Sequence, residues 1–184
     1  MKQLKMIKID GFRPDDSLPS GYLFTTHREE YTERWMRLIN KSIGEGWTTE
    51  LFNEKMLMRE GIGPQGIFYI LDKDSMVIAT ATGVLNAGEK TGRLHMVAAD
   101  ETHRGKGLGA PLCARVINYL YDNGMEKIML TTDDFRVPAI KIYIKLGFVP
   151  VLCDETMPGR WKALAEQTGC VIPPVITSSI LLSP

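Results

Sequence analysis

Apolar and polar residues alternate along the N-terminal half of the chain in patterns that predict strands and two helices. Residues 4–9 predict an edge strand, and residues 21–25 predict a second short strand. Apolar residues then recur three or four positions apart in two successive stretches, which predicts two amphipathic helices between residues 31 and 59. After a glycine-rich break, residues 67–71 and 76–85 predict the two strands of an antiparallel hairpin.

The C-terminal half alternates regularly between strand and helix patterns. The predicted strands are residues 93–99, 127–132 and 148–153, and the predicted helices are residues 105–123, 138–146 and 157–168. This order of elements predicts an α/β fold in which helices cover the faces of a mixed sheet. Periodicity alone leaves the function open.

The composition is that of an ordinary globular protein. The chain has 184 residues, with 22 Lys and Arg against 22 Asp and Glu, so its formal charge is zero. This length predicts a single domain over residues 1–184, long enough to bury a core without a disulfide or a metal. A neutral balance disfavours partners that are held mainly through phosphate charge, so we expect no nucleic-acid partner.

Cysteines and histidines are too few and too scattered for a disulfide framework or a metal site. The cysteines are Cys113, Cys153 and Cys170, while His27 and His103 have no partners at metal-ligand spacing. The first residues alternate Lys with apolar residues and lack the apolar run of a secretory signal. No stretch has the ~20 apolar residues of a membrane helix. We therefore expect a cytoplasmic protein with no metal and no membrane association.

The most informative segment is the glycine-rich loop at residues 104–109, Arg-Gly-Lys-Gly-Leu-Gly, which joins a predicted strand to a predicted helix. The first N–H groups of a helix lack intrahelical partners and carry the positive end of the helix dipole. Glycines let these amides approach a ligand closely, and Arg104 and Lys106 add positive charge. The loop therefore predicts a site for a phosphate or diphosphate.

Other glycine-rich sites fit this loop less well. A P-loop requires Gly-Lys-Ser/Thr, whereas Gly107 follows Gly105-Lys106. The spacing of Gly105, Gly107 and Ala110 matches the loose dinucleotide pattern, but its first glycine lies about five residues after the strand instead of directly after it. A purely structural role, in which the glycines only make a tight turn, stays open on this segment alone.

Two motifs give the chain a family resemblance. Arg104-Gly-Lys-Gly-Leu-Gly109 is similar to the acetyl-coenzyme A signature of the GNAT superfamily of N-acetyltransferases, Arg/Gln-x-x-Gly-x-Gly/Ala. Ala139-Ile-Lys-Ile-Tyr-Ile-Lys-Leu-Gly-Phe148 resembles that family's Ala-x-x-x-Tyr-x-x-x-Gly-Phe. The motifs flank the predicted strand 127–132 in the family's order. The resemblance covers roughly residues 20–152, which leaves a C-terminal helix and tail at 153–184.

The resemblance implies a mixed, mostly antiparallel sheet whose fourth and fifth strands, residues 93–99 and 127–132, splay apart. The first of these strands commonly carries a bulge in the family. The backbone groups of Val97 and Ala99 would then pair with the pantetheine arm of the cofactor as an added strand would. The diphosphate would lie over the amides of the loop, whose residues are Arg104, Gly105, Lys106, Gly107, Leu108 and Gly109.

The activity implied by the resemblance is that of an acetyl-CoA-dependent N-acetyltransferase. Such an acyltransferase moves the acetyl group directly to the primary amine of a small molecule or a protein. Family analogy assigns Tyr143 as the proton donor to the departing thiolate; a core aromatic role is the alternative. The chain has Arg136 where the family often has an Asn that holds coenzyme A, and Arg136 either reaches a phosphate or is solvated. This departure motivates a rival function, a coenzyme A-binding regulatory module that has lost turnover.

Several assignments stay open at this stage. The general base is one of five residues near the ends of the two key strands or a chain of waters; the residues are His95, Asp100, Glu101, Asp133 and Asp134. Three aromatic residues belong either to the core or to the acceptor pocket; they are Trp35, Trp47 and Phe52. The apolar tail at 170–184 either covers a sheet edge or packs against a second subunit, as in a homodimer.

Overall fold

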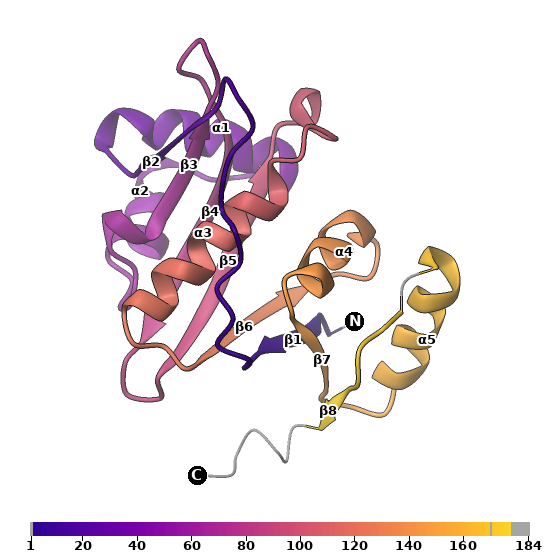
Figure 1. The fold of residues 1–184 in the computed structure, drawn as a ribbon. Helices are drawn as coiled ribbons and strands as arrows, with labels where there is room; N and C mark the ends of the chain where they lie inside the picture. Colours follow the sequence, from indigo (N-terminus) through magenta and orange to yellow (C-terminus); the bar gives the residue numbers. More distant parts are fainter. Residues whose placement is uncertain (1, 170, 178–184) are drawn as a thin grey trace.

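The computed structural model describes residues 2–169 and 171–177, which fold into one eight-stranded sheet flanked by helices (Figure 1). The strands are β1 (Leu4–Lys8), β2 (Leu23–Thr26), β3 (Ile67–Leu71), β4 (Val77–Asn86), β5 (Thr91–Ala99), β6 (Lys127–Thr132), β7 (Val149–Leu152) and β8 (Ile176–Thr177). The helices are α1 (Thr32–Ser42), α2 (Thr49–Phe52), α3 (Gly109–Asp122), α4 (Val137–Lys145) and α5 (Met157–Thr168). The strand order is β2-β3-β4-β5-β6-β1-β7-β8.

The sheet is mixed and mostly antiparallel, which confirms the predicted fold class. Only two neighbouring pairs, β5 with β6 and β7 with β8, run parallel among the described strands. The predicted hairpin forms as β3 and β4. The prediction of a single domain over residues 1–184 stays a prediction. None of the helices in the described part of the chain is long and apolar enough to cross a membrane.

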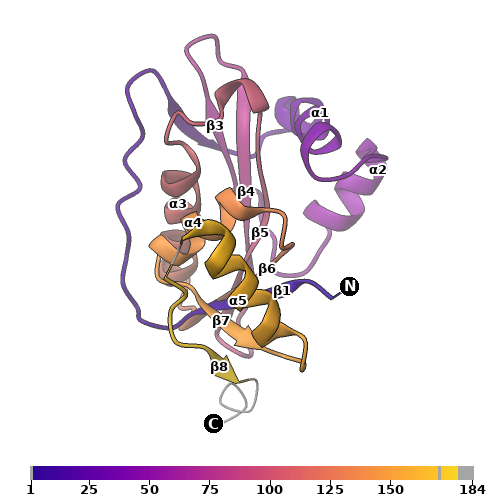
Figure 2. The same cartoon turned by 90° about the vertical axis from the view of Figure 1, so that its right-hand side faces the viewer.

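Helices cover both faces of the sheet, and the burial of β3 shows why. All five residues of β3 are buried. Ile67, Tyr69 and Leu71 pack in the layer of α1 and α2, while Phe68 and Ile70 pack in the layer of α3 and α4. Successive side chains of a strand point to opposite faces, so an unbroken apolar run requires cover on both. Figure 2 shows α1 and α2 on one side of β4 and β5, with α3 on the other.

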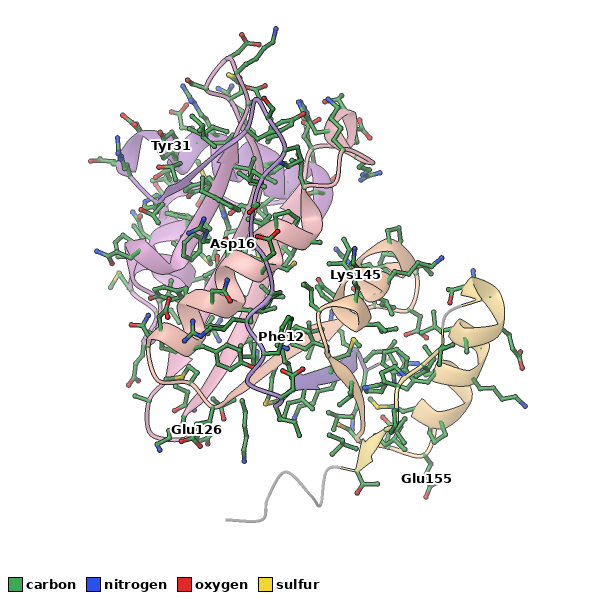
Figure 3. All side chains as sticks on the ribbon, in the orientation of Figure 1. Phe12, Asp16, Tyr31, Glu126, Lys145 and Glu155 are labelled. Atoms are coloured by element: carbon green, nitrogen blue, oxygen red, sulfur yellow. The ribbon has the colours of Figure 1, made fainter. Side chains whose placement is uncertain are left out.

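The N-terminal strand lies inside the sheet, so its prediction as an edge strand was wrong. β1 pairs with β6 on one side and β7 on the other. Leu4, Met6 and Ile7 are fully buried, and the lysines between the apolar residues gave the stretch a misleadingly exposed pattern. The segment after β1, which carries Phe12 and Asp16 in Figure 3, runs along α3, where Asp16 pairs with Arg115 at 2.9 Å.

The second predicted helix is shorter and less regular than expected. α2 has four residues and continues as a π-helical turn over Asn53–Leu57. Phe52 and Met56 are buried as their spacing predicts, but Arg59 lies beyond the turn and is exposed. Of the C-terminal tail, residues 171–177 are described, and they contain the two-residue strand β8. Ile176 and Thr177 pair with β7 at the edge of the sheet, which supports the edge-covering alternative for these residues; residues 170 and 178–184 lie outside the described residues.

Strands β5 and β6 diverge in the middle of the sheet. They pair only between Thr91–Arg93 and Lys127–Met129, and beyond those residues the two strands separate (Figure 1). Opposite Ala81 of β4, β5 has two residues, Met96 and Val97, and Met96 has a φ of 50°. This is the predicted β-bulge, and a bulge bends its strand and increases the local twist. We call the gap between the two strands the opening.

The glycine that ends α4 has a steric role that the motif alone does not show. Gly147 has a φ of 89°, and a Cβ there would lie 2.9 Å from Lys8 Nζ and 2.7 Å from Asp10 Oδ2. Lys8 is fully buried and pairs with Asp10. The Gly-Phe step of the second motif therefore places the α4–β7 turn against the end of β1.

Gly147→Ala is expected to lower the free energy of unfolding by about 2–4 kcal/mol, because it combines left-handed strain with displacement of the fully buried Lys8 ammonium from its half-exposed partner, Asp10. Chemical denaturation measures the change. Gly21→Ala is the matched control, since Gly21 has a φ of 86° and nothing within 4 Å of its Cβ position; it should lose only about 1 kcal/mol. Equal losses in the two variants would contradict the packing argument.

Candidate active site

The loop between β5 and α3 presents a row of unpaired amides. After the short 3₁₀ turn Glu101–His103, the amide of Arg104 donates to Glu101, and the next paired amide is that of Leu112, which donates to Leu108. Within the described part of the chain, none of the amides of residues 105–110 donates to a protein acceptor. α3 begins at Gly109, four residues later than predicted, because the preceding residues form this loop.

The loop has the backbone and the charge of an anion site. Gly105 and Gly107 both have a φ of 76°, and neither has an atom within 4 Å of its Cβ position. A left-handed backbone turns successive N–H groups toward one concave side. Arg104 and Lys106 are exposed and form no ion pair among the described residues. The arrangement is able to hold a phosphate or diphosphate.

The edge of β5 that faces the opening also carries unpaired backbone groups. The amide of Asp100 donates to Ile78 of β4 at 2.8 Å. Backbone groups of a strand point alternately to its two edges, so those of Ala99 and Val97 point to the opposite edge, from which β6 has departed. An extended ligand with amide groups can pair there as an added strand does.

A hollow of about 140 Å³, which we call the central hollow, lies in the opening. Its walls include His95, Met96 and Val97 of β5, Thr131 of β6, and Arg136 and Tyr143 at α4. Ile43, at the end of α1, closes it on the opposite face of the sheet. The central hollow therefore passes from one helical layer to the other. It brings Tyr143, Arg136 and Val97 together, whereas Ala99 and the glycine loop lie outside its walls.

Tyr143 is a buried side chain whose hydroxyl has no hydrogen-bond partner among the described residues. Its ring packs edge-on against Phe148, with the centroids 6.0 Å apart. Burial, with a smaller contribution from Cys113, raises the pKa of Tyr143 above its usual value, while Arg136 opposes this shift. Tyr143 therefore stays protonated and is able to donate a hydrogen bond into the central hollow. The loop reaches the same helix, because a Cβ on Gly109 would lie 2.7 Å from Ile142 Cδ1.

Arg136 is held in place and not freely solvated. Its Nε donates to Asp133 Oδ2 at 3.1 Å, and its guanidinium lies over the ring of Phe135. The neighbouring Asp134 accepts hydrogen bonds from Nε and Nη2 of Arg160 on α5. α5 thus fixes the β6–α4 turn on which Arg136 lies.

The candidate bases are now separable by their contacts. Asp100 accepts from the backbone and the hydroxyl of Thr102, which lowers its pKa, and the Arg160 hydrogen bonds lower the pKa of Asp134. Both carboxylates are therefore weak bases. Asp133 is occupied by Arg136 and Gln3. Only His95 and Asp133 of the five candidates line the central hollow.

His95 is neutral at physiological pH. Burial, reinforced by the positive charges of Arg59 and Arg93, lowers its pKa to about 4. A neutral imidazole is able to accept a proton or a hydrogen bond, although its basicity is low. His95 is therefore the free side-chain acceptor at the α1 end of the central hollow.

Burial shows which of the three aromatic residues belong to the core, and it also determines the reactivity of Cys113. Trp35 and Phe52 are fully buried in the core beneath α1 and α2, so they are core residues. Trp47 is partly buried and packs edge-on against Trp35. Cys113 is buried, and burial raises its pKa to about 12, which disfavours the reactive thiolate form. Cys170 lies outside the described residues.

Sequence reasoning missed a second cavity, which we call the arginine cavity. It has a volume of about 590 Å³ and lies at the other end of β5 from the glycine loop, with Arg59, Arg93 and Met129 among its lining residues. One signal was available in the sequence. Arg59 continues the spacing of the buried Phe52 and Met56, so a charged residue stood on an otherwise apolar stripe.

The low pKa of His95 predicts a specific acid destabilisation. The unfolded chain binds this proton near pH 6.5 and the folded chain only near pH 4, so stability is lost as the pH falls through that window. The loss is at most roughly 3 kcal/mol. Denaturation at several pH values should show a shallower loss for His95→Gln, and NMR should give a titration midpoint near 4. A midpoint near 6.5 would contradict the buried, positively charged setting.

Comparison with known proteins agrees with this geometry. The mycothiol acetyltransferase of Thermomonospora curvata is 24% identical over 77% of this chain and 48% of its own length. That of Thermobifida fusca is 33% identical over 46% of this chain and 29% of its own length. The chain thus spans less than half the length of these relatives.

The fold also matches solved structures. A GCN5-related N-acetyltransferase from Sphaerobacter thermophilus superimposes with a TM-score of 0.68 over 82% of this chain and 49% of its own, at 19% identity. Residues 26–148, which run from the last residue of β2 through α4 and include both motifs, match the family described as the acetyltransferase (GNAT) family. A match over this much of the sequence establishes that the chain belongs to the GNAT acetyltransferase family.

Proposed function

We propose that the chain is an N-acetyltransferase that transfers the acetyl group of acetyl-CoA directly to a primary amine. The observation that carries this proposal is the opening between β5 and β6, which has a row of unpaired amides at one end and Tyr143 in its wall. The reaction requires the protein to bind a phosphorylated thioester and to supply a proton or a hydrogen bond to its leaving thiolate. The amides match the first requirement and Tyr143 matches the second.

The residues present fit acetyl-CoA. The amides of residues 105–110, with Arg104 and Lys106, match a diphosphate in charge and in number of donors. The unpaired edge at Val97 and Ala99 matches the amides of a pantetheine arm. When bound, acetyl-CoA supplies a thioester, which is an acyl donor with a good leaving group. Arg136 lies at the side of the same opening and is available to a phosphate oxygen without leaving Asp133.

The proposed reaction balances without an acyl-enzyme. The lone pair of the neutral amine attacks the thioester carbonyl, a C–N bond forms, and the C–S bond breaks. The amine loses one proton and the thiolate takes up one, so the products are an amide and a free thiol. Direct attack is favoured because Cys113 is a buried thiol with a high pKa and neither it nor Cys153 lines the central hollow.

Tyr143 is assigned to the leaving group. Its raised pKa makes complete proton transfer to a thiolate unfavourable, so its contribution is a hydrogen bond that strengthens as charge develops on sulfur. The Val97 amide is assigned to the carbonyl oxygen in the same way, since it faces the opening. His95 is assigned as the acceptor for the amine proton, directly or through water, from the opposite face of the sheet.

The test of the proposal is the release of free thiol from acetyl-CoA in the presence of a panel of amines. Binding of coenzyme A without thiol release for any amine would favour a regulatory module instead.

The role of the glycine-rich loop is tested by Gly107→Val. This variant is expected to weaken coenzyme A binding at least about tenfold, because it removes the left-handed turn that aims the amides. Isothermal titration calorimetry measures the dissociation constant.

Gly46→Val is the matched control for Gly107→Val. Gly46 has a φ of 89° and nothing within 4 Å of its Cβ position, so the substitution imposes similar strain away from the loop. It should lose comparable stability and keep the wild-type affinity. Unchanged affinity in folded Gly107→Val would remove the loop from the donor site.

Tyr143→Phe is expected to reduce the maximal rate about 10- to 100-fold, because it removes the donor and keeps the ring that packs on Phe148. The dissociation constant of coenzyme A should change less than about twofold. Steady-state kinetics and calorimetry separate the two effects. Tyr119→Phe, on α3 and outside the central hollow, is the control. A wild-type rate in Tyr143→Phe would exclude this tyrosine from the reaction.

A further inference from the structure

The arginine cavity is larger than the central hollow, and its place on β5 relates it to the proposed reaction. Its volume of about 590 Å³ falls in the range of small-molecule sites, roughly 300–1,000 Å³. The glycine loop follows the C-terminal end of β5, whereas the arginine cavity surrounds its N-terminal end. A donor held at the loop and a molecule in this cavity would therefore approach the opening from opposite ends.

The arginine cavity adjoins the central hollow along the two diverging strands. Arg93 and Met129 face each other in the last register pair before the opening, and both line the arginine cavity. His95 and Thr131, each two residues further along, line the central hollow. Two residues of a strand span about 7 Å. A small molecule bound beside Arg93 therefore has one end within reach of the place where the acyl group is transferred.

Two unpaired arginines distinguish this cavity. Neither the Arg59 nor the Arg93 guanidinium forms a hydrogen bond or an ion pair with a described residue. Arg115, Arg136 and Arg160, by contrast, each pair with an aspartate. Guanidinium groups bind carboxylates and phosphates through parallel N–H donors. The segment that carries Arg59 is fixed beside β4, because Gly61 accepts a hydrogen bond from the Leu85 amide at 2.8 Å.

The cavity also has two glutamates, Glu60 and Glu89, so its net charge does not by itself select an anion. The positions of these charges within the cavity, however, favour an anion beside the opening. Arg93 lies in the last register pair before the opening, whereas Glu89 lies in the turn that precedes β5, farther from the opening. The positive charges of Arg59 and Arg93 also act on His95 in the opening. The positive end of the cavity is therefore the end next to the opening.

We propose that Arg59 and Arg93 bind an anionic group of the acceptor, so that the substrate is a small amine that also carries a carboxylate or a phosphate. This inference rests on the proposed acetyltransfer for its link to catalysis. It assigns the two arginines to specificity, with the amine directed along β5 toward His95 and the anion held at the mouth of the opening. The glutamates remain available to a second positive or hydroxyl group of the same molecule.

Matched pairs of amines test the inference, each pair differing only in the anion. One pair is an amino acid and its carboxamide, and the other is phosphoethanolamine and ethanolamine. For the preferred anion, kcat/KM of the wild-type enzyme should be at least about tenfold higher for the charged member. Comparison of the two pairs separates a carboxylate site from a phosphate site. Equal or better turnover of the neutral members would overturn the inference.

The variants Arg59→Gln and Arg93→Gln locate the effect. Each should raise KM for the charged amine about tenfold or more and change KM for the neutral amine less than about twofold. Any change in kcat that follows from the altered charge around His95 should be the same for both amines. Both side chains are exposed, so the folded state should tolerate the changes. Arg37→Gln, an exposed residue of α1 outside both cavities, is the control and should behave as wild type. An equal effect on charged and neutral amines would exclude anion recognition.

A binding measurement separates this inference from the proposed function. The imidazole NMR signal of His95 should shift on addition of the preferred charged amine and not its neutral counterpart, and Arg93→Gln should abolish the shift. If this pattern appears without thiol release from any amine, the anion site stands and the acetyltransfer proposal fails. If thiol is released but no amine shifts the signal in a charge-dependent way, the anion site is overturned and acetyltransfer stands.

Discussion

The central constraint on this molecule is a sheet that separates in its middle. β5 and β6 are neighbours, yet they share three register pairs and then part. Backbone groups in a protein interior need partners, because an unpaired one forfeits the free energy of a hydrogen bond. The opening therefore leaves an edge where most sheets have none, between two halves that are otherwise well packed. The bulge at Met96, the late start of α3 and the position of Tyr143 all serve this one feature.

Charge is arranged around the opening in a way that complements its geometry. Arg104 and Lys106 lie at one end of β5, and Arg59 and Arg93 lie at the other, although the chain as a whole is neutral. Between them, the opposite charges of Arg136 and Asp133 pair with each other, and the other groups are a protonated tyrosine on one face and a neutral imidazole on the other. An interior in which the charges pair, between two cationic ends, suits the proposed transfer of an acyl group from an anionic donor to an anionic acceptor.

Much of the fold and the donor side of the site was predictable from the sequence, because short patterns determine them. Glycine spacing in the loop and the Tyr-x-x-x-Gly-Phe step are local, and they carry the family resemblance that implied the opening, which the structure has. The role of Tyr143 in the reaction stays a prediction. Pairing over long distances is not local. The lysines of β1 resembled those of an edge strand, although β6 and β7 bury it from both sides. Arg59 and Arg93 line the same cavity although they are far apart in the chain, and no spacing in the sequence records that they share it.

The interior place of β1 has a consequence for biosynthesis. β1 ends at Lys8, but the strands on either side of it begin at Lys127 and Val149. During translation this apolar segment must wait without its neighbours until most of the polypeptide has left the ribosome, and such long-range pairing is slow to form. The half of the sheet beyond the opening, which consists of β6, β1, β7 and β8, is thus assembled last. Nascent chains should depend on chaperone protection of their first strand, and the ability to bind a thioester should emerge only after the final strands have docked.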